Sequence, residues 1–491
     1  MDTAEAGAAE SQGEAAAPRR TLGLTTATTI IVGSMIGSGI LLLPADMLAK
    51  LPSPPLVMAV FVVAAILTAV GALTVAELSG MFPKAGGQYV YLREAFGPFP
   101  AYLFGWTTFW VVQTGTIAAV AAAFAKILAR FVHLPGAATP LTVGGWSTGL
   151  TLPPYGQAFV AIALILLLTF VNYLGVRFGG LVSNVSTIAK AAGLLAVVAI
   201  VLAFAHPPVG AFGPATAVHQ PGEAGAGSAF TGVEVLAGFS TALMLILFAY
   251  DGWYSATYVA AEMRNPRRDV PLSLILGPLA TTVIYLAVAG ACLYAVSLTS
   301  ALHLGASEYL AGRAVQDAVG AGGATFVSVL ALVSIFGTTN AYILTAPRIA
   351  YAQAKDGLFL PSMARLDPRR GTPAYGSLLC GLWACLLVMT GLYDQLVASV
   401  VFAVFLFHVL TAAAHIKLRR SRPDAERPFR TPGGPTIPTL FLLTSLFVVV
   451  ATLTFPDYRV QALLELAIIA LGVPAYYLAR RKASRVAATP A

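Results

Sequence analysis

The sequence has very little charge. Only 10% of its 491 residues are Asp, Glu, Lys or Arg, whereas 58% are apolar. An ordinary soluble domain carries roughly a quarter charged residues. A chain of this composition cannot build a water-facing surface, so soluble enzymes and soluble binding modules are excluded. The sequence therefore predicts an integral membrane protein.

Cysteine is also scarce, and the common signatures of catalysis are missing. The three cysteines, Cys292, Cys380 and Cys385, all lie in apolar stretches. Cysteine there behaves as a small apolar residue, so no disulfide framework is predicted. The sequence contains no Walker loop, HExxH zinc pair or GxSxG nucleophile elbow. We therefore expect no enzyme activity, no metal site and no cofactor, and energy must come from gradients or exchange.

Long apolar stretches are abundant. A hydrocarbon core of about 30 Å needs roughly 20 apolar residues per helix, and twelve stretches reach that length. They cover residues 22–47, 55–80, 97–130, 156–176, 179–205, 231–261, 272–298, 324–354, 373–392, 395–417, 436–455 and 459–480. The predicted fold is an all-α membrane protein with twelve transmembrane helices. Between them, residues 307–319 suit a short helix with Arg313 four residues before Asp317, and a plain surface loop is an equal alternative.

The basic residues gather in alternate loops, which explains the net charge of +8 without nucleic acid. Cytoplasmic loops carry an excess of Lys and Arg, and an even number of spans then places both termini in the cytoplasm. Residues 1–20 are expected to form a disordered cytoplasmic tail, and residues 483–491 a C-terminal one. The cytoplasmic side would hold Arg19, Arg20, Lys84, Arg93, Arg177 and the basic residues of 264–268, 355–370, 417–430 and 480–485.

Two of the spans are interrupted by flexible or polar residues. Residues 33–39 contain three glycines and two serines, and residues 248–253 contain Asp251 followed by Gly252. Each interruption falls in the first helix of a block of five, so residues 21–205 and 231–420 are predicted to form an inverted repeat that brings the interruptions together. Residues 435–482, helices eleven and twelve, would be peripheral or face a dimer partner.

Unpaired backbone groups in lipid cost several kcal/mol unless something satisfies them, and a substrate can do so. Free amides of Gly37, Ser38 and Gly39 at the start of a half-helix would bind an anion. Carbonyls released at Phe248, Ala249 and Asp251 would bind an ammonium group. Together they suit the zwitterion of an α-amino acid. The alternatives are close helix packing through Gly33 and Gly37, and a capping role for Asp251.

A second isolated charge, Lys190, lies at membrane depth in the fifth span, with no Asp or Glu within a turn of it. Its ammonium could replace a sodium ion, couple transport to protons, or simply tether helices. Ser334, Thr338 and Tyr342 recur every four residues and share one helix face. Ser334 and Thr338 could meet Lys190, and Tyr342 the substrate side chain, with helix-packing hydrogen bonds as the alternative.

Several other polar and aromatic residues carry weaker expectations. Phe248 and Trp253 are expected to gate the site, and Trp253 and Tyr254 either line it or pack in the core. Gln113 and Thr116 are weaker candidates for the site. The remaining expectations are ion pairs with arginine for Glu77 and Glu262, and packing rather than proton relay for His408 and His415.

Four segments together resemble the amino acid, polyamine and organocation (APC) transporter superfamily. They are GSGI at 37–40, FPKAGGQYVY at 82–91, FAYDGW at 248–253 and EMRNPRRDVP at 262–271. The sixth-helix segment is most similar to the L-type amino acid transporters and their bacterial relatives. The resemblance covers roughly residues 22–420 and implies a LeuT-like fold with alternating access.

The resemblance also implies roles for individual residues. Met35 would offer a carbonyl to the substrate amine, Ser38 and Gly39 would bind the carboxylate, and Phe248 would close over it. Lys190 matches a lysine thought to stand in for sodium, and Tyr342 replaces a tryptophan of the arginine exchangers, which weakens the case for a cationic substrate. The full substrate-binding set expected is Met35, Ile36, Gly37, Ser38, Gly39, Phe248, Ala249, Asp251 and Tyr342.

We therefore expect a sodium-independent secondary transporter of L-amino acids, with neutral ones as substrates, working by exchange or proton symport in a plasma or inner membrane. The loop between the third and fourth spans has no cysteine, so no glycoprotein subunit is expected, and the protein would be a monomer or homodimer. A cationic amino acid or polyamine antiporter, with Asp251 as countercharge, is one alternative. An amino-acid-binding receptor or channel is the other.

Overall fold

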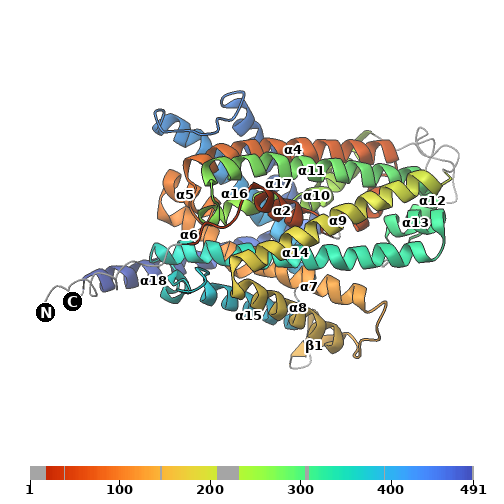
Figure 1. Ribbon diagram of the computed structural model, residues 1–491, viewed down its shortest axis with the longest axis horizontal. Coiled ribbons are helices and arrows are strands. Elements are labelled where there is room, and N and C mark those ends of the chain that lie inside the picture. The colour runs from red at the N-terminus through yellow and green to blue at the C-terminus, as the bar shows by residue number, and fades with distance from the viewer. Residues whose placement is uncertain are drawn as a thin grey trace.

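Long helices that run beside one another along the long axis dominate the molecule (Figure 1). The computed structural model describes residues 18–37, 39–143, 146–206, 232–304, 309–391 and 393–488. Within these residues, ten helices are long and apolar enough to cross a membrane, and two further apolar helices, Glu234–Ala249 and Ala374–Thr390, are shorter. A helical, multi-pass integral membrane protein is therefore confirmed.

The first five predicted spans correspond to helices that share an apolar composition and follow the expected order. They are α2 (Leu24–Met35) with α3 (Gly39–Lys50), α4 (Pro54–Met81), α6 (Pro98–Thr107) with α7 (Thr114–Leu128), α8 (Tyr155–Leu174) and α9 (Val176–Phe204). A π-helical stretch, Thr108–Gln113, joins α6 to α7, and the short helix α5 (Gln88–Phe96) precedes them.

The later spans follow in the same manner. They are α10 (Gly232–Ala249), α11 (Pro266–Ala295), α14 (Gly322–Lys355), α15 (Ala374–Thr390), α16 (Tyr393–Ser421), α17 (Thr436–Thr454) and α18 (Pro456–Ala488). The short helices α12 (Leu298–Leu302) and α13 (Leu310–Val319) lie between α11 and α14.

Both predicted interruptions are present as breaks in helices. The helix α2 ends at Met35, Ile36 has an extended backbone, and α3 begins at Gly39. The helix α10 ends at Ala249, and Gly252 adopts a φ of 88°, which favours glycine. These residues let the backbone leave the helical conformation where the sequence predicted it.

The sixth span differs from the prediction after its break. The sequence predicts one span over residues 231–261, but α10 is followed by turns and by the 3-10 helices Ser255–Thr257 and Ala260–Glu262. The left-handed Gly252 redirects the chain, and the Thr257 hydroxyl donates to the Tyr254 carbonyl at 2.7 Å. The next α-helix then starts at Pro266, a residue suited to a first helical turn.

Two connecting segments add detail to the helical fold. A two-stranded antiparallel hairpin, β1 (Thr139–Val143) and β2 (Trp146–Leu152), lies between α7 and α8 and corrects the all-α prediction locally. The predicted short helix is confirmed as α13, where Arg313 Nε lies 2.9 Å from an Asp317 carboxylate oxygen. Residues 307 and 308 of the predicted helix lie outside the described residues.

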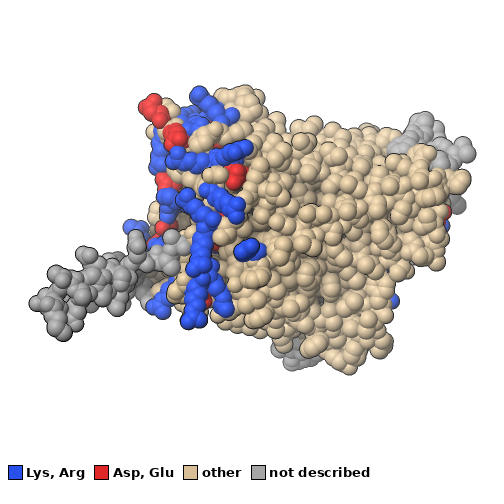
Figure 2. Space-filling view, in the orientation of Figure 1, with Lys and Arg blue, Asp and Glu red and all other residues tan. Residues whose placement is uncertain are grey.

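Basic side chains form a band at one end of the molecule (Figure 2), whereas α12 and α13 lie at the opposite end (Figure 1). The predicted ion pairs of Glu77 and Glu262 with arginine are confirmed. Glu77 accepts from Arg419 and Arg427, and Glu262 from the buried Arg348. These ion pairs join segments that are distant in the sequence.

Candidate functional site

The two helix breaks lie against each other because glycines allow close backbone contact. A Cβ atom on Gly39 would lie 3.1 Å from the Cβ of Ala249, and one on Gly252 would lie 2.8 Å from the Cβ of Ser34. The first turn of α3 contains no acidic residue, so its positive dipole end is not neutralised by its own side chains. The start of α3 and the end of α10 therefore meet, with opposite partial charges.

One hydroxyl reaches carbonyls of both broken helices. The Tyr285 hydroxyl oxygen lies 2.7 Å from the Met35 carbonyl oxygen and 3.0 Å from that of Ala249. Tyr285 comes from α11 and is completely buried. A hydroxyl has one proton and donates to one acceptor at a time. The two carbonyls thus form a paired acceptor with spare capacity for a further donor.

The side chain of Lys190 binds the end of α2 from another direction. Its Nζ atom lies 2.8 Å from the Gly33 carbonyl oxygen and 2.6 Å from that of Ile36. It also lies 3.1 Å from Thr338 Oγ1 and 3.3 Å from the Ser334 carbonyl oxygen. The side chain is 0% exposed, and no carboxylate pairs with it among the described residues. Neutral oxygens alone surround this ammonium group.

The polar face of α14 faces the first break, as its spacing predicted. Ser334 Oγ lies 3.0 Å from the Ile36 carbonyl oxygen and 3.2 Å from that of Gly37. Thr338 Oγ1 lies 3.0 Å from the Ile36 carbonyl oxygen. Tyr342, one turn further on, lies beside the second break, since a Cβ on Gly252 would be 3.3 Å from its hydroxyl. The structure thus brings Lys190 and this face together around the broken helices.

Some backbone groups expected to be free have partners. The Gly37 amide donates to the Met35 carbonyl at 3.0 Å, and the Phe248 carbonyl accepts from the Asp251 amide at 3.1 Å. Ser38 lies outside the described residues. The Met35 carbonyl therefore accepts from both Gly37 and Tyr285, whereas the Ala249 carbonyl has Tyr285 as its one donor among the described residues.

The aromatic residues beside the second break occupy different surroundings. Phe248 is half-buried at the end of α10. The Trp253 ring is buried and packs against His408 and Phe441, with ring centroids 5.4 Å and 6.1 Å away. This position favours the packing role for Trp253 over the gating role.

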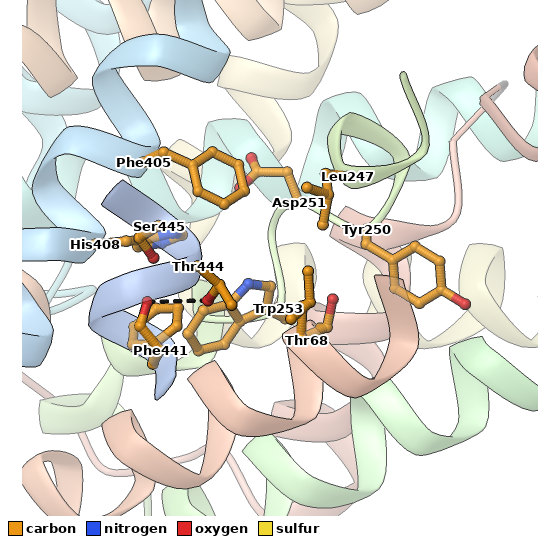
Figure 3. A pocket seen from close by; sticks show the side chains of 11 residues that line it. Thr68, Leu247, Tyr250, Asp251, Trp253, Phe405, His408, Phe441, Thr444 and Ser445 are labelled. Carbon is orange, nitrogen blue, oxygen red and sulfur yellow. Dashed lines mark hydrogen bonds between the residues drawn. The ribbon is translucent and has the colours of Figure 1, made fainter. Parts of the chain in front are cut away.

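Asp251 lines a small cavity behind the second break, formed with residues of α4, α16 and α17 (Figure 3). The Tyr254 hydroxyl lies 3.0 Å from one carboxylate oxygen of Asp251, and no cationic side chain pairs with Asp251 among the described residues. Across the cavity, neither ring nitrogen of His408 nor the Ser445 hydroxyl has a hydrogen-bond partner among the described residues. The cavity volume of about 20 Å³ is enough for one water molecule but not for an amino acid side chain.

His408 is enclosed by aromatic rings. Four of them, from Trp253, Tyr254, Phe405 and Phe441, have centroids 5.3 to 5.4 Å from its own. These surroundings are those of a packing residue, as the sequence predicted.

The third span contributes little to this site in the described residues. Thr116 Oγ1 donates to the Val112 carbonyl, one turn earlier, at 2.6 Å, and Gln113 Oε1 is buried with no hydrogen-bond partner among the residues that the structure describes. The π-helical stretch Thr108–Gln113 also contains Trp110, whose carbonyl accepts from Trp383 Nε1 at 2.9 Å.

The contacts at the basic end lie outside the membrane spans and hold α5 against the end of α14. The Tyr89 hydroxyl donates to an Asp356 carboxylate oxygen at 2.7 Å, and Arg93 pairs with the same carboxylate. Burial, together with the Asp356 charge, raises the pKa of the Tyr89 hydroxyl, so this group remains a proton donor. Among the residues of known placement, no cluster of three His, Cys, Asp or Glu side chains could bind a metal ion.

The main residue that sequence reasoning missed is Tyr285. The only signal for it was a tyrosine in the middle of an otherwise apolar span. A second missed contact joins Asn172 of α8 to Asn340 of α14, whose side chains bond at 2.9 Å. Met35 lies 250 residues from Tyr285, Ala249 lies 36 residues from it, and Asn340 lies 168 residues from Asn172, so spacing along the chain could not identify these partners.

Comparison with known proteins supports a common family. The family model described as amino acid permease matches residues 22–473. The chain is 32% identical to the human b(0,+)-type amino acid transporter 1 over 88% of this chain and 82% of that protein. It is 29% identical to the serine/threonine exchanger SteT of Bacillus subtilis, over 95% of this chain and 98% of that one. It is also 29% identical to the mouse large neutral amino acids transporter small subunit 2, over 97% and 84%.

Proposed function

The chain belongs to the amino acid permease family and transports amino acids, and we propose that it exchanges neutral L-amino acids by alternating access without sodium. The names of two relatives support the finer part of this proposal. One is called a serine/threonine exchanger, and another a large neutral amino acids transporter. Exchange driven by the opposing amino acid gradient would also explain the lack of an ATP-binding motif.

The proposed architecture is a LeuT-like arrangement of twelve spans. Residues 21–205 and 231–420 would form two five-helix repeats of inverted orientation, and residues 435–482 would lie outside them. Broken helices in the first position of both blocks support this assignment. The basic band would face the cytoplasm, together with both terminal tails, in a plasma or inner membrane. We propose a monomer or homodimer that needs no glycoprotein subunit.

The observation that carries the proposal is the shared contact of Tyr285 with the Met35 and Ala249 carbonyls. An ammonium group has three protons and would satisfy both acceptors at once, whereas the tyrosine hydroxyl satisfies one. The start of α3 at Gly39 lies against Ala249 and offers its positive dipole end to a carboxylate. The two charged ends of an α-amino acid would therefore find complementary partners in one place.

The remaining site residues have proposed roles that follow from their positions. Ile36 and Gly37 would shape the first break, and Lys190 would hold it, in place of a sodium ion, with the help of Ser334 and Thr338. Phe248 would close over bound substrate, and Tyr342 would contact the substrate side chain. Ser38, which lies outside the described residues, is proposed for the carboxylate from the sequence resemblance alone.

Uptake of labelled amino acid into proteoliposomes tests the proposal. The vesicles would be loaded with unlabelled serine or leucine and challenged outside with leucine, alanine, arginine or putrescine, with and without sodium and a pH gradient. We expect saturable counterflow that neutral amino acids compete for and that sodium does not affect. Non-saturating uptake without counterflow would indicate a channel, and binding without uptake a receptor.

A cationic amino acid or polyamine is the second candidate substrate, and Asp251 is the reason. Its carboxylate is largely buried and has a tyrosine hydroxyl but no cation beside it within the described residues. If it serves as a countercharge, Asp251→Asn abolishes competition by arginine and putrescine and leaves that by leucine. Competition by putrescine alone in the unmodified protein would reject the neutral substrate.

A further inference from the structure

A wide groove opens on the lipid-facing surface between α8 and α15, next to the basic end of the molecule. Its volume is about 960 Å³. The wall from α8 includes Leu166, Phe170 and Tyr173, and the wall from α15 includes Tyr375 and Leu378. The segment 364–368, which follows α14, closes one end of the groove.

The walls of the groove are apolar and unusually exposed. Phe170 and Tyr375 are each 58% exposed, Leu378 is 51% exposed and Leu166 is 43% exposed. In water such a surface would be costly to leave open, but here it belongs to two apolar helices of a membrane protein. Within a bilayer, the material that fills an apolar cleft of this kind is a lipid acyl chain.

The closed end of the groove carries positive charge. Arg365 lines the groove, and Arg369 follows four residues later; both are exposed, and neither pairs with a carboxylate among the described residues. Arg370 lies over the Tyr173 ring at 4.4 Å. Arginine binds phosphate through paired N–H groups, so this end of the groove suits a phosphate group.

One acidic residue, Asp367, also lines the groove, but its charge is already engaged. Its Oδ1 atom accepts from the backbone amides of Arg369 and Arg370 at 2.9 Å, and Oδ2 lies 3.8 Å from a guanidinium nitrogen of Arg370. Among the residues that line the groove, the positive charge without a carboxylate partner in the described residues is therefore that of Arg365, and the exposed Arg369 directly follows the lining segment 364–368.

Two other surface cavities lack this combination. The cavity of about 330 Å³ between α4 and α11 has no charged residue in its lining, so it could accept an acyl chain but could not select a headgroup. The cavity of about 450 Å³ beside α16 is lined by Lys417 and Arg420, and Lys417 lies over the Phe96 ring at 4.9 Å. The α8–α15 groove differs from both. It has long, exposed apolar walls, and next to them are arginines that pair with no carboxylate in the described part of the chain.

We propose that the α8–α15 groove binds one anionic glycerophospholipid, with an acyl chain between Phe170 and Leu378 and the phosphate at Arg365 and Arg369. Basic pockets between transmembrane helices bind anionic headgroups in this way. The proposal depends on the protein lying in a membrane and not on the amino acid that it transports.

Native mass spectrometry of the purified, full-length protein tests the charged end. Phosphatidylglycerol and phosphatidylcholine with identical acyl chains would be titrated separately. We expect one tightly bound phosphatidylglycerol, and Arg365→Gln/Arg369→Gln should weaken its binding about 30-fold, because each surface cation is worth about fivefold. The matched control is Arg264→Gln/Arg268→Gln, which removes two exposed arginines at the basic end, outside the groove.

The apolar end needs a separate pair of variants. Leu378→Trp should fill the groove and weaken phosphatidylglycerol binding, whereas Leu382→Trp, one turn further along the same helix and 46% exposed, should not. Retained binding in Leu378→Trp, equal binding of the two lipids, or equal loss in both arginine variants would overturn the proposal. So would a stoichiometric copurified protein that occupies the groove and leaves no lipid bound. Monodisperse elution and wild-type counterflow of each variant show that it is folded.

Discussion

Replacing Lys190 by methionine is the most informative change, because it removes the ammonium group and leaves an unbranched apolar side chain of similar length. The substitution eliminates the hydrogen bonds to the Ile36 and Gly33 carbonyls, which are 2.6 and 2.8 Å long. Hydrogen bonds to charged groups contribute about 1.5–3 kcal/mol each, so the gross loss is about 3–6 kcal/mol.

Neither carbonyl is left without a donor by this change. The Ser334 and Thr338 hydroxyls already donate to them at 3.0 Å, so the additional penalty of about 1–3 kcal/mol for an unsatisfied buried group is not incurred. A loss near 3 kcal/mol, the lower end of the gross loss, reduces the fraction of protein with an ordered break by about a hundredfold. The free energy of global unfolding should fall by less than this local loss, since the variant no longer buries a charge that has no opposite charge beside it.

The assay is counterflow in proteoliposomes over a range of pH, with thermal stability measured on the same preparations. We expect transport by Lys190→Met to fall by about a hundredfold, with a much smaller change in melting temperature. Lys355→Met, at an exposed site near the end of α14, is the matched control and should transport normally. Wild-type transport by Lys190→Met at every pH would refute the reasoning, as would a loss explained entirely by unfolding.

Three further changes test the packing around the site. Gly252→Ala should abolish transport, because the φ of 88° disfavours alanine and its Cβ would lie 2.8 Å from an atom of α2; normal counterflow would contradict this. His408→Phe should raise thermal stability by about 1–3 kcal/mol, since two unpaired ring nitrogens are removed, and a changed pH profile of transport would instead indicate proton relay. Glu262→Ala should destabilise the protein by about 3–5 kcal/mol, because it leaves the buried Arg348 unpaired. The exposed Glu426→Ala should cost less than about 1 kcal/mol, and equal effects would show that burial is not the cause.

The sequence was sufficient to predict features that depend on local composition. Apolar length identified the spans, and glycine content located both helix breaks. The four-residue spacing of Ser334 and Thr338 predicted that both would face one partner, and both contact the end of α2. An isolated lysine in lipid must find oxygen atoms, so carbonyls released by a nearby break were the natural expectation for Lys190.

Features that depend on which helices become neighbours could not be predicted in this way. The contact of Tyr285 with Met35 joins residues 250 positions apart, and nothing in the local sequence of α11 distinguishes this tyrosine from one that packs in the core. The hairpin between α7 and α8 is similar, because short strands outside the membrane depend on pairing between segments rather than on apolar length.

Successive carbonyls at the end of α2 bind different partners, which a break in the helix allows and a continuous helix would not. In a helix, neighbouring carbonyls point the same way along the axis and are already bonded. Here Ile36 has an extended backbone, and its carbonyl binds Lys190, whereas the preceding carbonyl of Met35 binds Tyr285. The ammonium group of Lys190 and that of the proposed substrate would therefore not compete for the same carbonyl oxygens. In the proposed mechanism, Lys190 would hold the break in place while the Met35 and Ala249 carbonyls exchange the Tyr285 hydroxyl for the substrate ammonium group.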